Sequence, residues 1–336
     1  MTFESNTGTL TCESCGHKEQ IEGYQEEWDI VNNQTHTATF DDEEARQYLC
    51  KKCGAVLVTD NHTAADICCF CGSNMTSGGR ISGDYAPSRV IPFTVSKKEA
   101  VKAFQKWRRK LKFSPKDFAK EKHTKKVVGI YIPFWLSDLR CQGEAKLQCT
   151  KSQIKGTGED AVTETSHFDI FRQVDLSLDS IPVYASDKVS DKILQALEPF
   201  DYSAAKAFHA SALAGFVAEK YSYTDKEILP QITKRAEKYI DEYISTTITG
   251  YDTVSFTDRE YHISQTAIDY ILLPVWMVYY DYGNEEYIFA VNGQTGKLAA
   301  IPPRSVSKIA VSIGLLMVFF FCIFRIITVL LGGPLL

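Results

Sequence analysis

Two closely spaced cysteine pairs constrain the fold of this chain more than any other feature. Each pair belongs to a C-x-x-C-G knuckle, and fourteen residues separate Cys53 from Cys68. The glycine of each knuckle permits a positive φ, so that two sulfurs can turn toward one metal ion. Four thiolates at this spacing predict a tetrahedral Zn²⁺ site. The predicted ligands are Cys50, Cys53, Cys68 and Cys71.

A third knuckle, Cys12-Glu-Ser-Cys15-Gly, lacks an obvious partner pair. A shift of 56 positions places Cys12 on Cys68 and Cys15 on Cys71, so residues 1–16 are interpreted as a partial zinc-ribbon half. Two interpretations are open for this incomplete second site. The other half belongs upstream of a truncated start, or Cys12 and Cys15 recruit other ligands, for which His17 and His36 are candidates.

The cysteine pattern also indicates the redox compartment. Knuckle spacing is typical of metal ligands rather than disulfides, and no signal peptide precedes the first knuckle. We therefore expect reduced thiols on the cytosolic side of a membrane. Cys69 is interpreted as a bystander, and Cys141 and Cys149 as reduced core residues rather than nucleophiles.

An apolar segment near the C-terminus predicts a membrane anchor. Residues 309–324 are apolar, Gly, Ser or Cys, and the run resumes after Arg325 to Leu331. Twenty-three helical residues extend about 34 Å, enough to cross a hydrocarbon core of about 30 Å. We expect residues 305–336 to form a tail anchor in the cell membrane, with a single pass. Basic residues on the near side favour a cytosolic N-terminal region; they are Lys297, Arg304 and Lys308.

Two capping boxes predict helices in the region between the cysteines and the anchor. Ser96-Lys-Lys-Glu99 opens a basic amphipathic helix with Phe104 and Trp107 facing inward. Thr224-Asp-Lys-Glu227 opens a longer helix, and its predicted inward residues are Ile228, Ile232, Ala236, Tyr239, Ile240 and Tyr243. A third helix is expected from Ser186 to Leu197, before Pro199.

Strand-like segments and a weak internal repeat complete the predicted fold. Strands are expected over residues 55–59, 127–139, 162–178 and 270–291. Ile130-Tyr-Ile-Pro-Phe-Trp135 matches Ile271-Leu-Leu-Pro-Val-Trp276 at an offset of 141. The prolines predict edge or bulged strands, with each Trp anchoring the core.

The predicted fold class is α+β. A β zinc ribbon precedes a domain of antiparallel sheet and helices, followed by one transmembrane helix. The expected boundaries are 1–16 for the partial ribbon half, 17–49 for an acidic connector, 50–80 for the four-cysteine ribbon, 81–304 for the α+β domain and 305–336 for the anchor.

Charge is distributed unevenly along the chain. Residues 1–60 contain twelve Asp/Glu against four Lys/Arg, whereas residues 97–126 contain thirteen Lys/Arg against three Asp/Glu. The basic segment suits nucleic acid or anionic lipid headgroups. The acidic N-terminal region and the charge of about −2 on a four-thiolate zinc site argue against nucleic acid as a partner.

Motifs for catalysis are not found. The segment Gly293-Gln-Thr-Gly-Lys297 has the wrong spacing for a phosphate loop and predicts a hairpin turn. The sequence contains neither H-E-x-x-H nor G-x-S-x-G. We therefore expect no enzyme activity and no small-molecule substrate.

The chain resembles TFIIB-type zinc-ribbon membrane proteins of Gram-positive bacteria, often labelled after the zinc region of the primosomal replication-restart helicase PriA. The resemblance covers nearly the whole chain. It rests on CKKCGAVLVTD, CCFCGSNM, APSRVIPFTVSKKEAVKAFQKW, GIYIPFWLSDL, LEPFDY, LAGFVAEKY, LLPVWMVYYDY and FAVNGQTGK. Members carry four knuckles in two ribbons, and this sequence lacks the first. No helicase ATPase region is present.

The resemblance implies a membrane-associated scaffold or adaptor. Such proteins occur with SPFH-domain and phage-shock-type membrane-stress proteins, which are the implied partners together with the lipid bilayer. We expect a cytosolic protein-binding platform. The alternative is a membrane-tethered nucleic-acid-binding protein, which the basic segment 97–126 supports.

Overall fold

The computed structural model describes residues 2–4, 9–11, 18–20, 39–40, 45–61, 63–81, 84–115, 118, 124–156, 161–282 and 285–330. This part of the chain is α+β and divides into two compact units. The first unit comprises Met1–Pro92, Ile130–Asp191 and Asp201–Pro274. The second comprises Phe93–Gly129, Lys192–Phe200 and Val275–Leu336.

A large mixed sheet organises the first unit, in the order β10-β7-β12-β8-β11-β5-β4-β6, with β9 paired to β8. Its strands are β4 (Ala45–Leu49), β5 (Val56–Asp60), β6 (Thr76–Arg80), β7 (Arg89–Val90), β8 (Thr124–Lys155), β9 (Val162–Tyr184), β10 (Lys206–Ala207), β11 (Val217–Glu219) and β12 (Thr253–Tyr282). A separate antiparallel sheet contains β1 (Thr2–Glu4), β2 (Thr9–Thr11) and β3 (Lys18–Gln20). The β11–β8 and β7–β12 pairs are parallel, so the expectation of an antiparallel sheet was incomplete.

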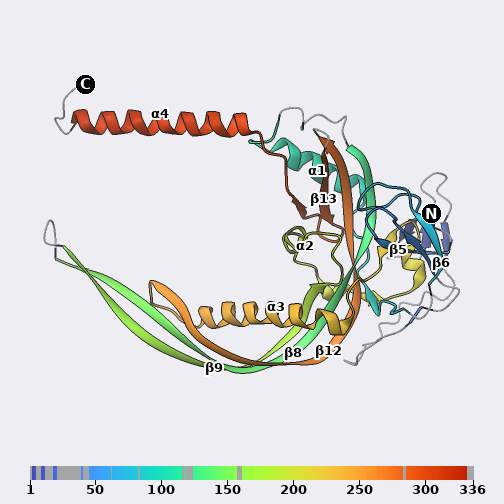
Figure 1. Ribbon diagram of the computed structural model, residues 1–336, viewed down its shortest axis with the longest axis horizontal. Helices are drawn as coiled ribbons and strands as arrows, with labels where there is room; N and C mark the ends of the chain where they lie inside the picture. The colour runs from blue at the N-terminus through green and yellow to red at the C-terminus, as the bar shows by residue number, and fades with distance from the viewer. Residues whose placement is uncertain are drawn as a thin grey trace. The chain divides into compact units, whose positions relative to one another are not determined.

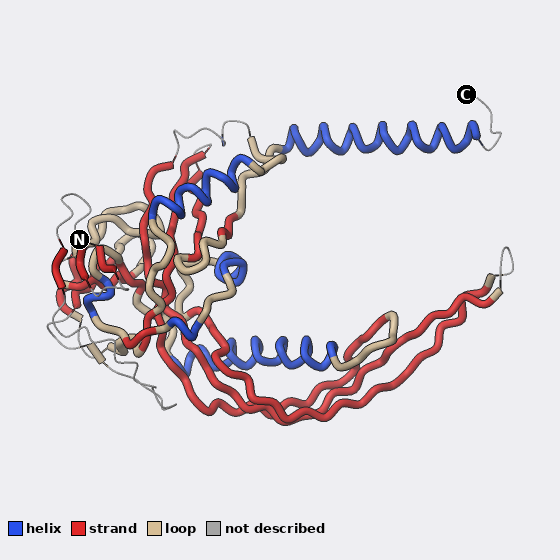
Figure 2. The backbone as a smooth tube through the Cα atoms, turned by 180° about the vertical axis from the view of Figure 1, so that it is seen from behind, coloured by secondary structure: helices blue, strands red, loops and turns tan. Residues whose placement is uncertain are grey.

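Two of these strands, β8 and β12, are much longer than predicted, and β9 begins at the predicted residue and continues past Leu178 to Tyr184. β8, β9 and β12 contain 32, 23 and 30 residues and run side by side as a long curved ribbon (Figures 1 and 2). A β-bulge shifts the β8–β9 register between Ser137 and Leu139, and the Asp138 carboxylate accepts a hydrogen bond from the Ser180 N–H there. Bulges increase local bend and twist. Gly143 lies where β8 and β12 approach closely, because a Cβ there would come within 2.2 Å of the Glu260 carbonyl oxygen.

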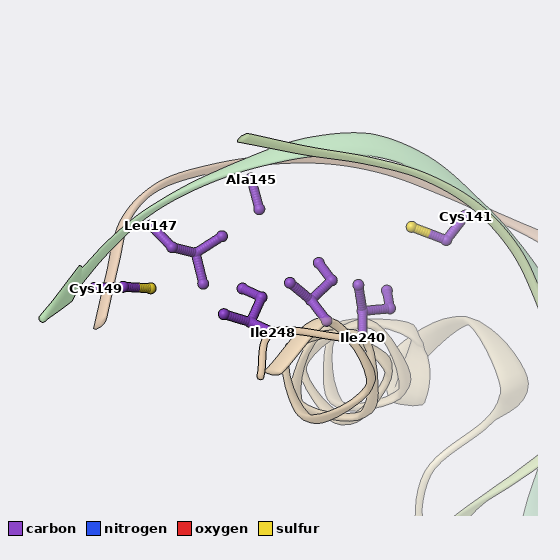
Figure 3. Packing of buried hydrophobic residues seen from close by; sticks show 7 residues of the cluster. Cys141, Ala145, Leu147, Cys149, Ile240 and Ile248 are labelled. Carbon is purple, nitrogen blue, oxygen red and sulfur yellow. The ribbon is translucent and has the colours of Figure 1, made fainter. Parts of the chain in front are cut away.

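The helix α3 (Asp225–Thr246) covers one face of this ribbon (Figure 1). Its predicted capping box is present at Thr224 and Glu227. Figure 3 shows Ala145 and Leu147 of β8 pointing toward Ile240 and Ile248. The cluster also contains Cys141, Cys149 and Ile244, which confirms that the two cysteines are core residues.

One predicted core position of α3 is wrong. Tyr243 is half exposed, and Ile244 is buried in its place. The buried residues repeat every four positions along one row, and Tyr243 lies one position outside that row. The row comprises Ile228, Ile232, Ala236, Ile240 and Ile244.

The second unit contains α1 (Lys97–Arg109), most of α2 (Asp191–Leu197), β13 (Glu285–Asn292), β14 (Leu298–Ala300) and α4 (Val306–Leu330). The predicted capping box at Ser96 begins α1, and Phe104 of this helix packs on Phe118, Val278 and Phe289. Residues 293–297 form the predicted turn between β13 and β14.

The predicted third helix is shorter than expected. Residues 186–190 are not helical, and α2 begins at Asp191. The Val189 N–H donates to the Tyr184 hydroxyl, which holds the segment against the sheet before the helix begins.

The internal repeat is visible in the pairing of β8 and β12. β8 pairs with β11 at Ile130 and Tyr131, and with β9 from Phe134 onward. β12 pairs with β7 at Ile271 and Leu272, and with β13 from Val275 onward. In both sets of pairings, the β12 position lies 141 residues after the corresponding β8 position.

The proline of each motif lies where one partner strand ends and the next begins. Both strands have neighbours on each side, so neither Pro133 nor Pro274 lies on an edge strand. The exchange of partner strands leaves a gap in the hydrogen-bond ladder, and this gap suits a residue without an N–H. The prediction of an edge strand was therefore wrong, whereas β8 does carry a bulge, between Ser137 and Leu139.

The repeat also extends to the helices. Trp135 donates its indole N–H to the carbonyl of Tyr223, directly before the α3 cap. Trp276 donates to the carbonyl of Val95, directly before the α1 cap. Each buried Trp thus fixes a helix start, as well as filling the core as predicted.

The first repeat comprises β7-α1-β8-β9, and the second comprises β11-α3-β12-β13. The two repeats exchange their short strands and helices. β7 pairs with β12 of the second repeat, and β11 pairs with β8 of the first. Likewise α3 packs on β8 as well as on β12 of its own repeat, and α1 packs on β13 as well as on β8 of its own. The long strands of each repeat therefore complete the core of the other.

The helix α4 follows the last hairpin. It contains the one segment of the described residues that is long and apolar enough to cross a membrane, Val306–Ile327, and none of the residues in the apolar window of this segment is buried. Its 22 residues extend about 33 Å at 1.5 Å per residue.

Candidate metal centre

The four predicted ligands converge in the first unit. Every pair of sulfurs among Cys50, Cys53, Cys68 and Cys71 lies within 4.8 Å. The Cys50 and Cys71 sulfurs are 3.4 Å apart, and those of Cys53 and Cys68 are 3.6 Å apart. A tetrahedral ion with four bonds of about 2.3 Å requires sulfur separations of about 3.8 Å. The group could therefore hold a metal ion.

The two knuckles share one backbone geometry. Gly54 and Gly72 have φ of +73° and +69°, which a side chain would strain. The Gly54 N–H donates to the Cys50 carbonyl at 2.9 Å, and the Gly72 N–H donates to the Cys68 carbonyl at 3.1 Å. This turn directs the two sulfurs of each knuckle to the same side, as the C-x-x-C-G pattern predicts.

The strand between the knuckles joins the site to the rest of the first unit. β5 follows the first knuckle and pairs antiparallel with β4. Its other edge pairs with β11, so that Val58 faces Ala218 and Leu57 faces Glu219. The ligands are thus held on the large sheet rather than on an isolated ribbon.

The surroundings of the sulfurs make the ionisation of the thiols unequal. Burial raises the pKa of Cys50, but hydrogen bonds from the backbone N–H groups of Cys53 and Lys52 outweigh it and lower the pKa to about 7. Burial raises the pKa of Cys53 and of Cys68. Four adjacent thiolates repel one another, and a divalent cation is the charge that would stabilise them.

The other predicted site residues fall outside this cluster. Cys69 is buried and its sulfur is not among the converging four, in agreement with a bystander role. Burial raises the pKa of its thiol well above the usual value. Cys12, Cys15, His17 and His36 lie outside the described residues.

A buried carboxyl group near the sheet was not anticipated. Glu219 on β11 is 1% exposed, and the Tyr184 hydroxyl lies 2.7 Å and 3.0 Å from its two oxygens. Burial raises the pKa of Glu219 to about 7. In the sequence, Glu219 is a lone acidic residue in a short apolar strand. It belongs to no motif, so sequence reasoning did not single it out.

Comparison with known proteins gives one relationship along nearly the whole chain. The chain is 42% identical over 333 residues to a Bacillus subtilis (strain 168) protein described as "Uncharacterized protein YdjG", covering 99% of this chain and 96% of the relative. No family model matches the chain. No solved structure matches it. Identity of this extent places the chain in the same protein family as YdjG of Bacillus subtilis.

Proposed function

We propose that this protein is a membrane-anchored zinc-ribbon scaffold or adaptor. The observation that supports it is the set of four converging thiols, because four protein ligands occupy every position of a tetrahedral ion. A closed site has no position for water or substrate, so the ion stabilises the fold instead of performing chemistry. When bound, Zn²⁺ would link the two knuckles and so fix both ends of the loop that contains β5.

Metal analysis of purified, reduced protein tests the zinc assignment. We expect Cys53→Ser to lose one equivalent of zinc per chain, because three thiolates cannot close the site. The matched control is Cys69→Ala, which removes a neighbouring buried thiol outside the cluster and should retain the metal. Equal zinc content in wild type and Cys53→Ser would contradict the assignment.

The membrane topology is the second part of the proposal. We infer that α4 spans the cell membrane once and that the preceding residues lie in the cytosol. Its support is the exposed apolar surface of Val306–Ile327. Deletion of residues 306–336 should release the protein from membranes washed with alkaline carbonate. Protease added to intact protoplasts should leave the N-terminal region uncut, and digestion of that region would reverse the orientation.

The finer family assignment and the partners rest on the resemblance to TFIIB-type zinc-ribbon membrane proteins. We propose SPFH-domain or phage-shock-type proteins of the same membrane as partners. The long β8-β9-β12 ribbon gives the scaffold an extended surface, and a membrane anchor raises the effective concentration of such partners. Cross-linking in cells should capture these candidates with the wild type and with Cys69→Ala, and less with Cys53→Ser. If α4 fused to an unrelated protein captured the same partners equally well, the scaffold proposal would be contradicted.

A membrane-tethered nucleic-acid binder is the second candidate. It is supported by exposed basic side chains along α1, which are Lys97, Lys98, Lys102, Lys106 and Arg109. The scaffold proposal predicts no appreciable duplex-DNA binding at physiological salt, and no ATP hydrolysis because residues 293–297 form a hairpin turn. Sub-micromolar binding of duplex DNA that weakens steeply with salt would favour the second candidate.

A further inference from the structure

A groove of about 610 Å³ lies where the end of α1 meets the beginning of α4, within the second unit. Its volume falls in the range of about 300–1,000 Å³ that is typical of small-molecule sites. Most of its lining is apolar and comes from both segments: Leu111, Phe113, Ile309, Ile313 and Leu316. Phe113 is half exposed although it is a large apolar side chain, so the groove presents apolar surface that this unit leaves uncovered.

The two walls of the groove are fixed to each other. The Ser305 N–H donates to the Phe113 carbonyl at 2.7 Å. The Lys308 Nζ donates to the Ser114 carbonyl at 2.7 Å. These bonds join the segment after α1 to the first turn of α4, so the groove is formed before any ligand arrives.

Three of the residues that line this largely apolar groove are basic. Lys110, Lys112 and Arg304 are exposed, and no hydrogen bond or ion pair joins their side chains to other described residues. No carboxylate is among the described residues that line the groove. Three positive charges with no carboxylate beside them in this lining attract an anion.

The order of these groups along α4 matches a bilayer interface. Arg304 precedes the helix, Ile309 lies in its first turns, and Ile313 and Leu316 follow on later turns. The lining therefore changes from cationic to apolar in the direction in which α4 would enter hydrocarbon. A molecule that fits both ends carries a negative headgroup joined to an aliphatic chain.

We propose that this groove binds one anionic phospholipid of the leaflet from which α4 emerges. The phosphate pairs with Lys110, Lys112 and Arg304, and an acyl chain lies over Ile309, Ile313 and Leu316. This inference rests on the proposal that α4 spans the membrane. It goes beyond that proposal, because it assigns a lipid class and a defined site on the protein.

Native mass spectrometry of the full-length protein in detergent tests the site, with phosphatidylglycerol and phosphatidylcholine as probes. The wild type should retain phosphatidylglycerol at least five-fold better than phosphatidylcholine. Each basic residue near a headgroup of net negative charge contributes about a five-fold preference over a zwitterionic one. The triple variant Lys110→Gln, Lys112→Gln, Arg304→Gln should lose the preference.

Two further variants separate the groove from general surface charge. The matched control Lys97→Gln, Lys98→Gln, Lys102→Gln removes three exposed charges of α1 that do not line the groove, and it should keep the preference. Ile313→Trp fills the apolar part and should reduce retention of both lipids. A photoactivatable phosphatidylglycerol should cross-link to residues 110–113 and 309–316 in the wild type.

Several results would overturn the lipid site. An equal loss in the control variant would indicate non-specific attraction, and unchanged retention in Ile313→Trp would place the acyl chain elsewhere. Cross-linking of Phe113 to a second copy of this chain, in place of lipid, would identify the groove as a protein interface. Alkaline extraction of membranes measures the topology of α4 separately, so loss of lipid preference with intact anchoring refutes this inference alone.

Discussion

Replacing Glu219 by Gln should remove a pH dependence of stability that the structure places at one buried carboxyl group. Burial raises the pKa of Glu219 from 4.5 to about 7, although hydrogen bonds from Ser186 and Tyr184 oppose the rise. The folded protein therefore holds a proton on Glu219 over a pH range in which the unfolded chain has released it. Stability from this group is complete below pH 4.5 and is lost as the pH rises toward 7.

The magnitude follows from the two pKa values. A rise of the pKa from 4.5 to about 7 corresponds to about 3 kcal/mol in total, most of which is lost between pH 5 and pH 8. Gln has the size of Glu and keeps an oxygen that accepts from the Tyr184 hydroxyl, but it does not titrate.

Urea unfolding of the full-length, metal-loaded protein in detergent measures this effect. The free energy of unfolding of Glu219→Gln, relative to wild type, should rise by about 2–3 kcal/mol from pH 5 to pH 8. Comparing the variant with wild type at each pH cancels the titration of the thiols. The control Glu237→Gln changes an exposed carboxylate of α3 and should change the free energy of unfolding little at either pH. A flat difference for Glu219→Gln would refute the assignment of a buried, protonated carboxyl.

Five other substitutions test the packing of the fold by the same unfolding measurement. Ile244→Ala should cost about 2–5 kcal/mol because Ile244 is buried against the ribbon, whereas Tyr243→Ala at the half-exposed neighbour should cost under about 1 kcal/mol. A larger destabilisation by Tyr243→Ala than by Ile244→Ala would support the helix face predicted from sequence, in which Tyr243 faces inward. Gly143→Ala should destabilise by about 1–3 kcal/mol, since the added carbon would displace β12 at Glu260, and a neutral result would show that the strands do not approach so closely. Trp135→Phe and Trp276→Phe should cost similar amounts, about 1–3 kcal/mol each, because each leaves one carbonyl before a helix cap unpaired. Strongly unequal costs would show that the two indoles do not have equivalent roles.

The features predicted well from sequence are those set by local chemistry. The knuckle glycines require positive φ, and the capping boxes at Ser96 and Thr224 satisfy the first N–H groups of α1 and α3. The apolar run of α4 and the turn at residues 293–297 are also local. In each case neighbours in sequence are the interacting groups.

Features that depend on distant partners were missed or incomplete. β8 continues to Lys155 because β9 and β12 supply its hydrogen bonds, while its sequence beyond Leu139 is largely polar on one face. The positions of Pro133 and Pro274 became clear only from the change of partner strand. The burial of Glu219 depends on Tyr184, which lies 35 residues earlier.

The exchange of elements between the repeats has a consequence for how the chain acquires its structure. The β7–β12 pair joins Val90 to Leu272, and the β11–β8 pair joins Val217 to Ile130. The first repeat completes neither its short-strand pairing nor the packing of α1 until the second has been synthesised. A ribosome-bound first half must therefore keep α1 and β8 without all of their final neighbours. Contacts this distant along the chain make folding slow. The metal knuckles, formed from 22 consecutive residues, can close long before the sheet to which they are joined.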